Sequence, residues 1–287
     1  MNKIVFVLSV LFLTLCAKPS IADDSVLKTG FAPVNGINLY YEIHGQFRKA
    51  EHPLVLLHGG GSTIESNYAN FIPLLARNRQ VIAIEEEGHG HTKMTPRALT
   101  FENSADDVAA LLDYLHISDA DIFGFSNGGT VALQVAIRHP EKVHRLIVAS
   151  GLSRRDGMVK GFFEGMKKAT IAQMPAVLLD ADRKINPDPK HQQELFTIDS
   201  QRMIHFVDIP DKKIRSIRAP SLIINGDQDV VLPEHAFRMA REISGARVAI
   251  LPSNHGGYVG SVDSGPLDTG LVEITIRLIT SFLDKRP

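Results

Sequence analysis

Gly124-Phe125-Ser126-Asn127-Gly128-Gly129 is the stretch that decides the fold of this chain. It follows an apolar run from Ala120 to Phe123 and opens a helical pattern, so the serine falls where a strand turns into a helix. A serine in the spacing G-x-S-x-G at such a junction is typical of a nucleophile elbow. The turn forces the serine backbone into an unfavourable conformation, and the flanking glycines remove the steric collisions that side chains would cause. The serine hydroxyl is then exposed, and the helix that follows directs its first amides toward any anion formed there.

Three further motifs occur in an order that fits this turn. His58-Gly59-Gly60-Gly61 follows an earlier apolar segment, Gly226-Asp227-Gln228-Asp229 follows a late one, and Ser253-Asn254-His255-Gly256 follows the next. Serine, then acid, then histidine is the chain order of the α/β-hydrolases. On these residues the chain resembles that superfamily from near Gly30 to the C-terminus.

Apolar runs alternate with helical patterns along most of the chain. The alternation favours an α/β fold with a mostly parallel central sheet and helices on both faces. The expected strands cover 37–43, 54–57, 81–84, 121–125, 145–149, 222–225 and 247–251, and the expected helices cover 101–115, 128–139, 233–243 and 269–283.

Between Ala149 and Ser221 this alternation breaks. In the superfamily that the chain resembles, an insertion at this point forms a small helical cap over the active site. The expected organisation is therefore a first part of the core over 23–151, a cap over 152–216 and a second part of the core over 217–287.

The N-terminus has the pattern of a secretory signal peptide. Lys3 precedes the mostly apolar run Ile4–Cys16, and Ser20-Ile21-Ala22 offers a cleavage site after Ala22. The apolar run is short for a membrane span, although an uncleaved anchor is an alternative. We expect residues 1–22 to be removed and the mature protein to be periplasmic or secreted, without stable insertion in a membrane.

Charge and cysteine content narrow the classes of partner. Loss of Lys3 and Lys18 takes the formal net charge from −1 to −3, which disfavours nucleic acid as a partner. The sole cysteine, Cys16, leaves with the signal peptide, so the mature chain has no disulfide and no thiolate nucleophile. The expected partner is a small molecule, and the sequence does not predict an oligomeric state.

Ser126, His255 and Asp229 are the expected catalytic residues. A serine hydroxyl is a weak nucleophile and needs a neighbouring base, and that base needs a group that holds its tautomer and stabilises its cation. Ser126 is the expected nucleophile, His255 the base and then acid, and Asp229 the orienting carboxylate. Asp227 lies in the same turn, but the spacing of the resembled superfamily favours Asp229.

A tetrahedral intermediate also needs hydrogen-bond donors for its oxyanion. We expect the backbone amides of Asn127, the residue after the nucleophile, and of Gly60 to supply them. The alternative is that His58–Gly61 is a phosphate-binding loop. No G-K-[S/T] motif follows it, which argues against a nucleotide site.

Met and Phe residues of the predicted cap are candidates for an apolar substrate pocket, since their side chains adapt to irregular ligands. The residues expected to bind substrate are Phe125 of the elbow and Phe162, Phe163 and Met166 of the cap, with Met158, Met174 and Met203 as further candidates. Packing of the cap onto the core is the alternative role for each.

Glu85-Glu86-Glu87-Gly88-His89-Gly90-His91-Thr92 resembles the D-x-R-G-x-G-x-S loop of the superfamily, with Glu85 in place of the usual Asp and Glu87 in place of the usual Arg. The change removes the ordinary salt bridge and leaves an acidic cluster. A solvated acidic turn is the first interpretation. A subsite for a cationic substrate and a metal site at His89 and His91 are alternatives, and we expect no metal.

These features predict an exported serine hydrolase that cleaves a carboxylic ester or lactone through an acyl-enzyme on Ser126, without a cofactor. Serine at the elbow argues against the epoxide hydrolase and dehalogenase relatives, which use Asp there. A perhydrolase or haloperoxidase, a carbon–carbon bond hydrolase, an aminopeptidase, an acyltransferase and a non-catalytic binding protein of the same fold are the alternatives.

Overall fold

One sheet organises the part of the chain that the computed structural model describes, residues 26–48 and 51–285. The predicted signal peptide lies outside these residues. The strand order is β1-β2-β4-β3-β5-β6-β7-β8, in which β1, β2 and β4 pair antiparallel and all pairs from β4 to β8 are parallel. The strands are β1 (Val26–Val34), β2 (Ile37–His44), β3 (Leu54–Leu57), β4 (Val81–Glu85), β5 (Ala120–Phe125), β6 (Val143–Ala149), β7 (Ser221–Gln228) and β8 (Arg247–Asn254). The predicted α/β class with a mostly parallel sheet is confirmed.

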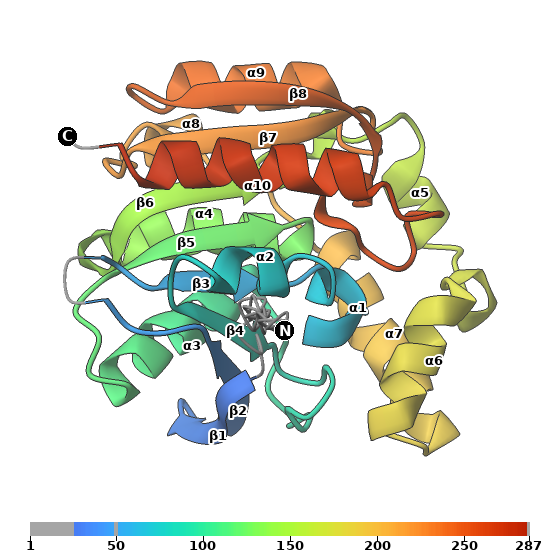
Figure 1. Cartoon of the computed structure of the whole chain (residues 1–287). Helices are drawn as coiled ribbons and strands as arrows, with labels where there is room; N and C mark the ends of the chain where they lie inside the picture. Colours follow the sequence, from blue (N-terminus) through green and yellow to red (C-terminus); the bar gives the residue numbers. More distant parts are fainter. Residues whose placement is uncertain (1–25, 49–50, 286–287) are drawn as a thin grey trace, which may run out of the picture.

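Helices cover both faces of the sheet (Figure 1). The α-helices are α1 (Ile64–Tyr68), α2 (Ile72–Ala76), α3 (Phe101–Tyr114), α4 (Asn127–Arg138), α5 (Phe162–Met166), α6 (Ala176–Ile185), α7 (Pro189–Ile204), α8 (Asp211–Ile214), α9 (Pro233–Glu242) and α10 (Thr269–Leu283). Buried side chains of α1, α2 and α10 form one apolar cluster with the sheet, and those of α3, α4 and α9 form another.

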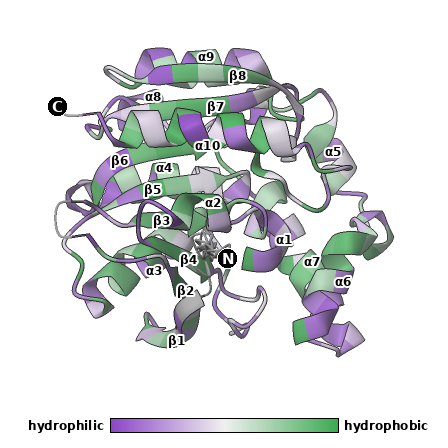
Figure 2. Ribbon diagram, in the orientation of Figure 1, coloured by the Kyte–Doolittle hydropathy of each residue, from purple (hydrophilic) through white to green (hydrophobic). Residues whose placement is uncertain are grey.

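The central strands carry most of the hydrophobic core. Every residue of β3, β4 and β5 is buried, as expected for parallel strands that are covered on both faces. Figure 2 shows the hydrophobic residues gathered in these strands, with hydrophilic residues toward the outside of the helices. This rigid sheet fixes the strand ends from which the site is built.

Strand β1 was not expected from the sequence. It forms a hairpin with β2 through Asn35 and Gly36, whose φ angles are 47° and 85°. Asn-Gly is the strongest short sequence signal for such a turn, because both positions need a positive φ. The strand lies at the edge of the sheet and its Phe31 side chain is exposed, so its apolar pattern is weak.

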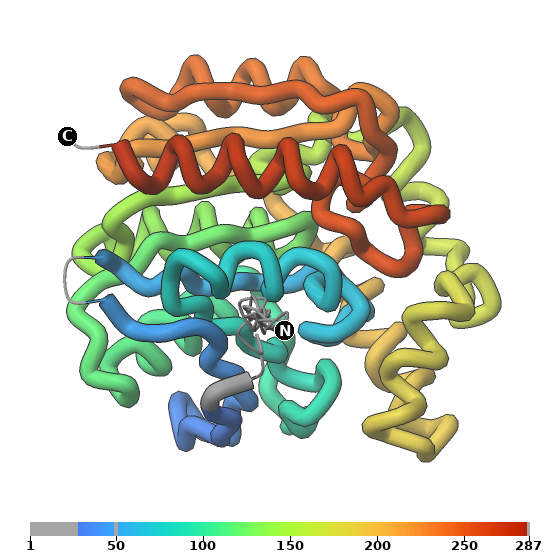
Figure 3. The backbone as a smooth tube through the Cα atoms, viewed as in Figure 1, coloured from blue at the N-terminus to red at the C-terminus, as the bar shows by residue number. Residues whose placement is uncertain are grey.

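The helical cap lies at the carboxyl ends of the parallel strands. The chain leaves the sheet after β6, forms α5 to α8 and returns at β7, as the yellow and orange segments of Figure 3 trace. Ligands of open α/β sheets bind at this end of the strands. The cap therefore covers the face on which a site is expected.

Candidate active site

The elbow has the strained geometry that the sequence predicts. Ser126 lies between β5 and α4 with φ 55° and ψ −119°, outside the ordinary regions for a residue with a side chain. A Cβ on Gly124 would lie 2.0 Å from the Gly128 carbonyl oxygen, and one on Gly128 would lie 2.1 Å from the Leu57 carbonyl oxygen. Both positions therefore require glycine, and the turn depends on them.

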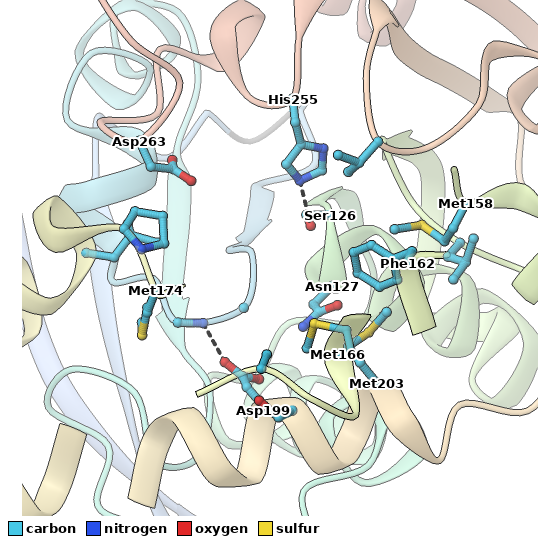
Figure 4. A pocket seen from close by; sticks show the side chains of 18 of the residues that line it. Ser126, Asn127, Met158, Phe162, Met166, Met174, Asp199, Met203, His255 and Asp263 are labelled. Carbon is cyan, nitrogen blue, oxygen red and sulfur yellow. Dashed lines mark hydrogen bonds between the residues drawn. The ribbon is translucent and has the colours of Figure 1, made fainter. Parts of the chain in front are cut away.

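Ser126, His255 and Asp229 lie in one hydrogen-bonded line. The Ser126 Oγ is 3.0 Å from His255 Nε2, and His255 Nδ1 is 2.7 Å from Asp229 Oδ1. Figure 4 shows the imidazole of His255 directed at Ser126. Asp229 follows β7 directly and His255 follows β8 directly, so the ends of β5, β7 and β8 supply the three side chains, with β6 between β5 and β7 in the sheet. This is the arrangement by which a histidine can take the serine proton while a carboxylate holds the ring.

Asp229 is held by more donors than the sequence reveals. Its Oδ1 accepts from the Val231 amide at 2.9 Å and its Oδ2 from the Ser150 hydroxyl at 2.5 Å. Burial alone raises the pKa of Asp229, but the hydrogen bond and charge of His255, with these two donors, outweigh burial and lower the pKa. Asp229 is therefore a carboxylate throughout the neutral range.

Ser150 and Tyr258 extend this line beyond Asp229, and the sequence analysis missed both. The Ser150 hydroxyl lies 2.6 Å from the Tyr258 hydroxyl. Since Ser150 donates its proton to the carboxylate, Tyr258 must donate to Ser150. Ser150 has a φ of 50°, a strained conformation for a serine, which places its hydroxyl beneath Asp229.

Asp227, the other candidate for the acid, is exposed and takes no part in this line. Its Oδ1 accepts from the Ser253 amide at 2.9 Å and so joins the carboxyl ends of β7 and β8. The structure therefore brings Asp229, and not Asp227, to His255.

The loop of Gly59, Gly60 and Gly61 faces the elbow. A Cβ on Gly60 would lie 2.5 Å from the Asn127 side-chain nitrogen, so a side chain at this position would displace that of Asn127. Both Gly60 and Asn127 line the cavity beside Ser126. Asn127 is the first residue of α4, where backbone N–H groups have no partner within the helix. The two amides expected to hold an oxyanion thus belong to residues on the same side of the nucleophile.

A cavity of about 360 Å³ opens above Ser126. Of the residues expected to bind substrate, Phe162 and Met166 line it, and so do the further candidates Met158, Met174 and Met203.

Phe125 and Phe163 do not line the cavity, which corrects the expectation for them. Phe125 packs against the rings of His255 and Tyr258, with centroids 4.9 Å and 6.2 Å apart. Phe163 is buried in the cap with the Arg155 guanidinium 3.6 Å from its ring centroid. The two residues stabilise the site and the cap rather than contact a ligand.

The acidic lining of the cavity is partly neutralised, because Asp199 is paired with His89 and Arg202. Asp199 and Asp263 are its acidic lining residues, and among the described residues no lysine or arginine lines it. Most of the remaining lining is apolar. An apolar cavity with two carboxylates is a poor site for an anionic ligand and a suitable one for a neutral ester.

The acidic turn Glu85–Glu87 is buried and paired, so the interpretation as a solvated turn is wrong. Each carboxylate is about 2 % exposed, and none of the three lines the cavity. Their partners include His91 Nδ1 at 2.8 Å for Glu85, Arg202 Nη1 at 2.6 Å for Glu86 and Arg97 Nε at 2.8 Å for Glu87. The carboxylates link the core to the cap and to neighbouring loops.

His89 and His91 are also engaged within the protein. His89 Nε2 lies 2.9 Å from Asp199 Oδ2, and His91 pairs with Glu85. In the described residues no cluster of three or more His, Cys, Asp or Glu side chains is placed to hold a metal ion. No helix within the described ranges is long and apolar enough to span a bilayer.

The elbow, the line of three side chains and the covered sheet define the class of an α/β hydrolase, and comparison with known proteins agrees. The family model of the alpha/beta hydrolase fold matches residues 52–178. A 2-hydroxy-6-oxo-2,4-heptadienoate hydrolase of Pseudomonas putida is 30% identical over 224 residues, which are 70% of this chain and 81% of that protein. The chain belongs to the α/β-hydrolase superfamily.

Two further relatives show how widely this superfamily ranges. The serine hydrolase BPHL of Homo sapiens is 24% identical over 254 residues, which are 82% of each chain. The crystal structure of the enol-lactonase from Burkholderia xenovorans superposes with a TM-score of 0.70 at 21% identity, over 89% of this chain and 100% of that one. The structural likeness supports the fold, and the superfamily's members act on small molecules by different reactions.

Proposed function

We propose that this protein is a serine hydrolase that cleaves a neutral carboxylic ester or lactone through an acyl-enzyme on Ser126. The observation that carries the proposal is the continuous line from Ser126 to His255 to Asp229, with hydrogen-bond distances of 3.0 Å and 2.7 Å, at the floor of a mostly apolar cavity.

The reaction has two halves. The Ser126 Oγ attacks the carbonyl carbon while His255 Nε2 takes its proton, and the amides of Gly60 and Asn127 stabilise the oxyanion. His255 gives that proton to the leaving alkoxide oxygen, the carbon–oxygen bond breaks, and the acyl-enzyme remains. Water then attacks the acyl carbon and gives a proton to His255, which returns it to Ser126 as the acid leaves.

Carbon–carbon bond hydrolysis is the second candidate, because the Pseudomonas putida relative is named as a hydrolase of a heptadienoate. A dienoate carries a carboxylate at neutral pH, and a site for it needs a compensating cation. The lining is mostly apolar and no lysine or arginine is among its described residues, while Asp199 is already paired with His89 and Arg202, so the lining favours a neutral substrate instead.

The test is reaction with a fluorophosphonate, followed by hydrolysis of nitrophenyl esters, lactones and a dienoate. Ser126→Ala should lose labelling and on the order of 10⁶ in kcat, as dissected triads do. Ser200→Ala is a matched control, since Ser200 lines the same cavity from α7 without touching His255. A folded Ser126→Ala variant with more than about a tenth of wild-type activity would reject the proposal.

We also propose that the protein is exported and begins at Asp23 after cleavage, on the pattern of Lys3, the apolar run and Ser20-Ile21-Ala22. N-terminal sequencing of the protein recovered outside the cytoplasm tests this. Retention of residues 1–22 would contradict it.

A further inference from the structure

Helix α7 of the cap places a carboxylate against the loop that is expected to bind the oxyanion. The Asp199 Oδ2 accepts from the Gly61 amide at 2.5 Å, and Figure 4 marks this bond. On the other side of the loop the Gly59 amide donates to Asn67 Oδ1 at 2.7 Å. Gly60 therefore lies between two anchored amides. Glycine backbone has no preferred conformation of its own, so these anchors determine where the Gly60 amide points.

The contacts of His89 determine its charge. Its Nδ1 is 3.0 Å from the Glu87 carbonyl oxygen and its Nε2 is 2.9 Å from Asp199 Oδ2. Both of these partners are acceptors, which favours an imidazolium that donates from both ring nitrogens over the neutral tautomer whose Nε2 would accept from the Gly61 amide. The Gly61 amide is 3.2 Å from His89 Nε2, farther than from Asp199. Burial lowers the pKa of His89, but the charge and hydrogen bond of Asp199 and the charge of Glu86 outweigh it and raise the pKa above its usual value.

The neighbouring His58 is neutral by the same reasoning. Its Nδ1 donates to the Gly59 carbonyl at 2.7 Å, and its Nε2 accepts from the Glu86 amide at 3.0 Å. Burial, with the charge of His89, lowers the pKa of His58 to about 4. Of the two adjacent histidines, only His89 carries a charge that can balance Asp199.

Arg202 and Glu86 complete a buried array of four charges with no net charge. Arg202 donates from Nη2 to Asp199 at 2.8 Å and from Nη1 to Glu86 at 2.6 Å. The side chains of Arg202, Glu86 and His89 are at most 2 % exposed and that of Asp199 is 14 % exposed. Buried charges persist only when paired, so the array is held as a unit between cap and core.

We infer that Asp199, paired with His89, is a positioning residue of the oxyanion hole: it holds the Gly61 amide and thereby the adjacent Gly60 amide. This inference rests on the proposed function. The cap then contributes to the chemical step as well as to substrate choice, although no cap residue belongs to the line from Ser126 to Asp229.

The pair gives the activity an upper pH limit. The groups that face His89 are His58 from the loop after β3, Glu86 and the Glu87 carbonyl from the loop after β4, and Asp199 and Arg202 from α7. As pH rises through the raised pKa of His89, its Nε2 loses the proton that it donates, and a lone pair then faces the Asp199 carboxylate. Repulsion between that lone pair and the carboxylate weakens the hold of Asp199 on the Gly61 amide, so kcat falls on the alkaline side.

Asp199→Asn tests the inference because an amide keeps the shape and removes the charge. The asparagine amide has one oxygen and one nitrogen, and either can occupy the former Oδ2 position. The oxygen accepts from the Gly61 amide, whereas the nitrogen is a donor and cannot. With a nitrophenyl ester we expect kcat to fall about 10- to 100-fold, less than the 10²–10³ seen when an oxyanion donor is removed outright. KM should change by less than about threefold, because the oxyanion exists only in the transition state. The alkaline limb should move to lower pH, because His89 loses its counter-ion.

Two further variants separate positioning from folding. Asp188→Ala removes the side chain that caps α7 by accepting from the Lys190 amide, and it loosens the same helix without touching Gly61. It should keep wild-type kcat and the wild-type pH profile. His89→Gln can still donate to Asp199 but does not titrate, so it should lose the alkaline limb and keep more kcat than Asp199→Asn.

The outcomes are distinct. An unchanged kcat in a folded Asp199→Asn variant of an active enzyme overturns the inference alone. So does an alkaline limb that persists in His89→Gln, or an equal loss of kcat in Asp188→Ala. A wild type that neither hydrolyses the ester nor reacts with a fluorophosphonate overturns the proposed function and this inference together.

Discussion

Replacing Asp229 by asparagine changes the side chain that has the most hydrogen bonds of the three in the line from Ser126 to Asp229. The carboxylate has donors on both oxygens: His255 and the Val231 amide at Oδ1, and Ser150 at Oδ2. If the amide nitrogen of asparagine takes the Oδ1 position, it opposes the Val231 N–H and forces His255 to carry its proton on Nε2, where it cannot accept from Ser126. If it takes the Oδ2 position, the tautomer survives but the imidazolium has no counter-charge.

Either arrangement costs most of the chemical step. Dissected triads lose about 10⁴ in kcat on this change, which is about 5 kcal/mol of transition-state stabilisation at roughly 1.4 kcal/mol per tenfold. The effect on folding is smaller, about 1–3 kcal/mol, because at most one buried donor is left without an acceptor. We expect kcat to fall by about 10⁴ with KM little changed, and the variant to remain folded.

Asp227→Asn is the matched control, two residues earlier at the end of β7. Asp227 is exposed and accepts only the Ser253 amide among the hydrogen bonds of the described residues, and asparagine keeps that acceptor. The free energy of unfolding of Asp227→Asn should stay within about 0.5 kcal/mol of the wild-type value, and its kcat within roughly twofold of the wild-type kcat. Steady-state kinetics on a nitrophenyl ester and thermal unfolding of both variants decide the matter. A large loss of kcat in Asp227→Asn, with activity retained in Asp229→Asn, would refute the assignment.

Two other predictions concern the cap and acid stability. Phe162→Ala should change the preferred acyl length, because Phe162 lines the cavity. Phe163→Ala should lower the free energy of unfolding by about 3–5 kcal/mol without changing selectivity. Activity on esters of increasing acyl length, with unfolding curves, checks both, and the reverse pattern would contradict them. Burial holds the pKa of His58 and of His235 at about 4, below the value near 6.5 of an unfolded chain. The stability that this gives is present above about pH 6.5 and is lost as pH falls toward 4, by roughly 3 kcal/mol per histidine at most. Urea unfolding at pH 7, 5 and 4 measures it, and equal stability at all three would be inconsistent with neutral buried histidines.

The parts of the fold that sequence predicts are those with a local cause. The elbow at Ser126 is specified by glycines within two residues of it, whereas the preference for Asp229 over Asp227 comes from the resemblance to the superfamily. The ends of β3 and α10 agree with the expected ranges because their apolar patterns are continuous. The hairpin at Asn35 and Gly36 also has a local signal, the Asn-Gly pair, in which both residues have a positive φ.

The parts that sequence does not predict depend on partners far along the chain. Glu86 has no cationic neighbour within the acidic turn Glu85–Glu87, and its burial becomes reasonable only when Arg202, which lies 116 residues later, is brought to it. Asp199 gives one faint signal, its i, i+3 spacing to Arg202 on a helix. Nothing local tells Phe162 from Phe163, because neighbouring helical residues point about 100° apart and only the packed cap shows which one faces the cavity.

The order of the motifs along the chain has a consequence for synthesis. Ser126 and the amide that follows it leave the ribosome first, whereas His255 lies 129 residues later and Asp229 only 26 residues before His255. A partly made chain can therefore fold its first strands around the serine and still have no base to activate it. Any product that stops short of β8 would be unable to acylate itself or to attack esters in the compartment where it is made.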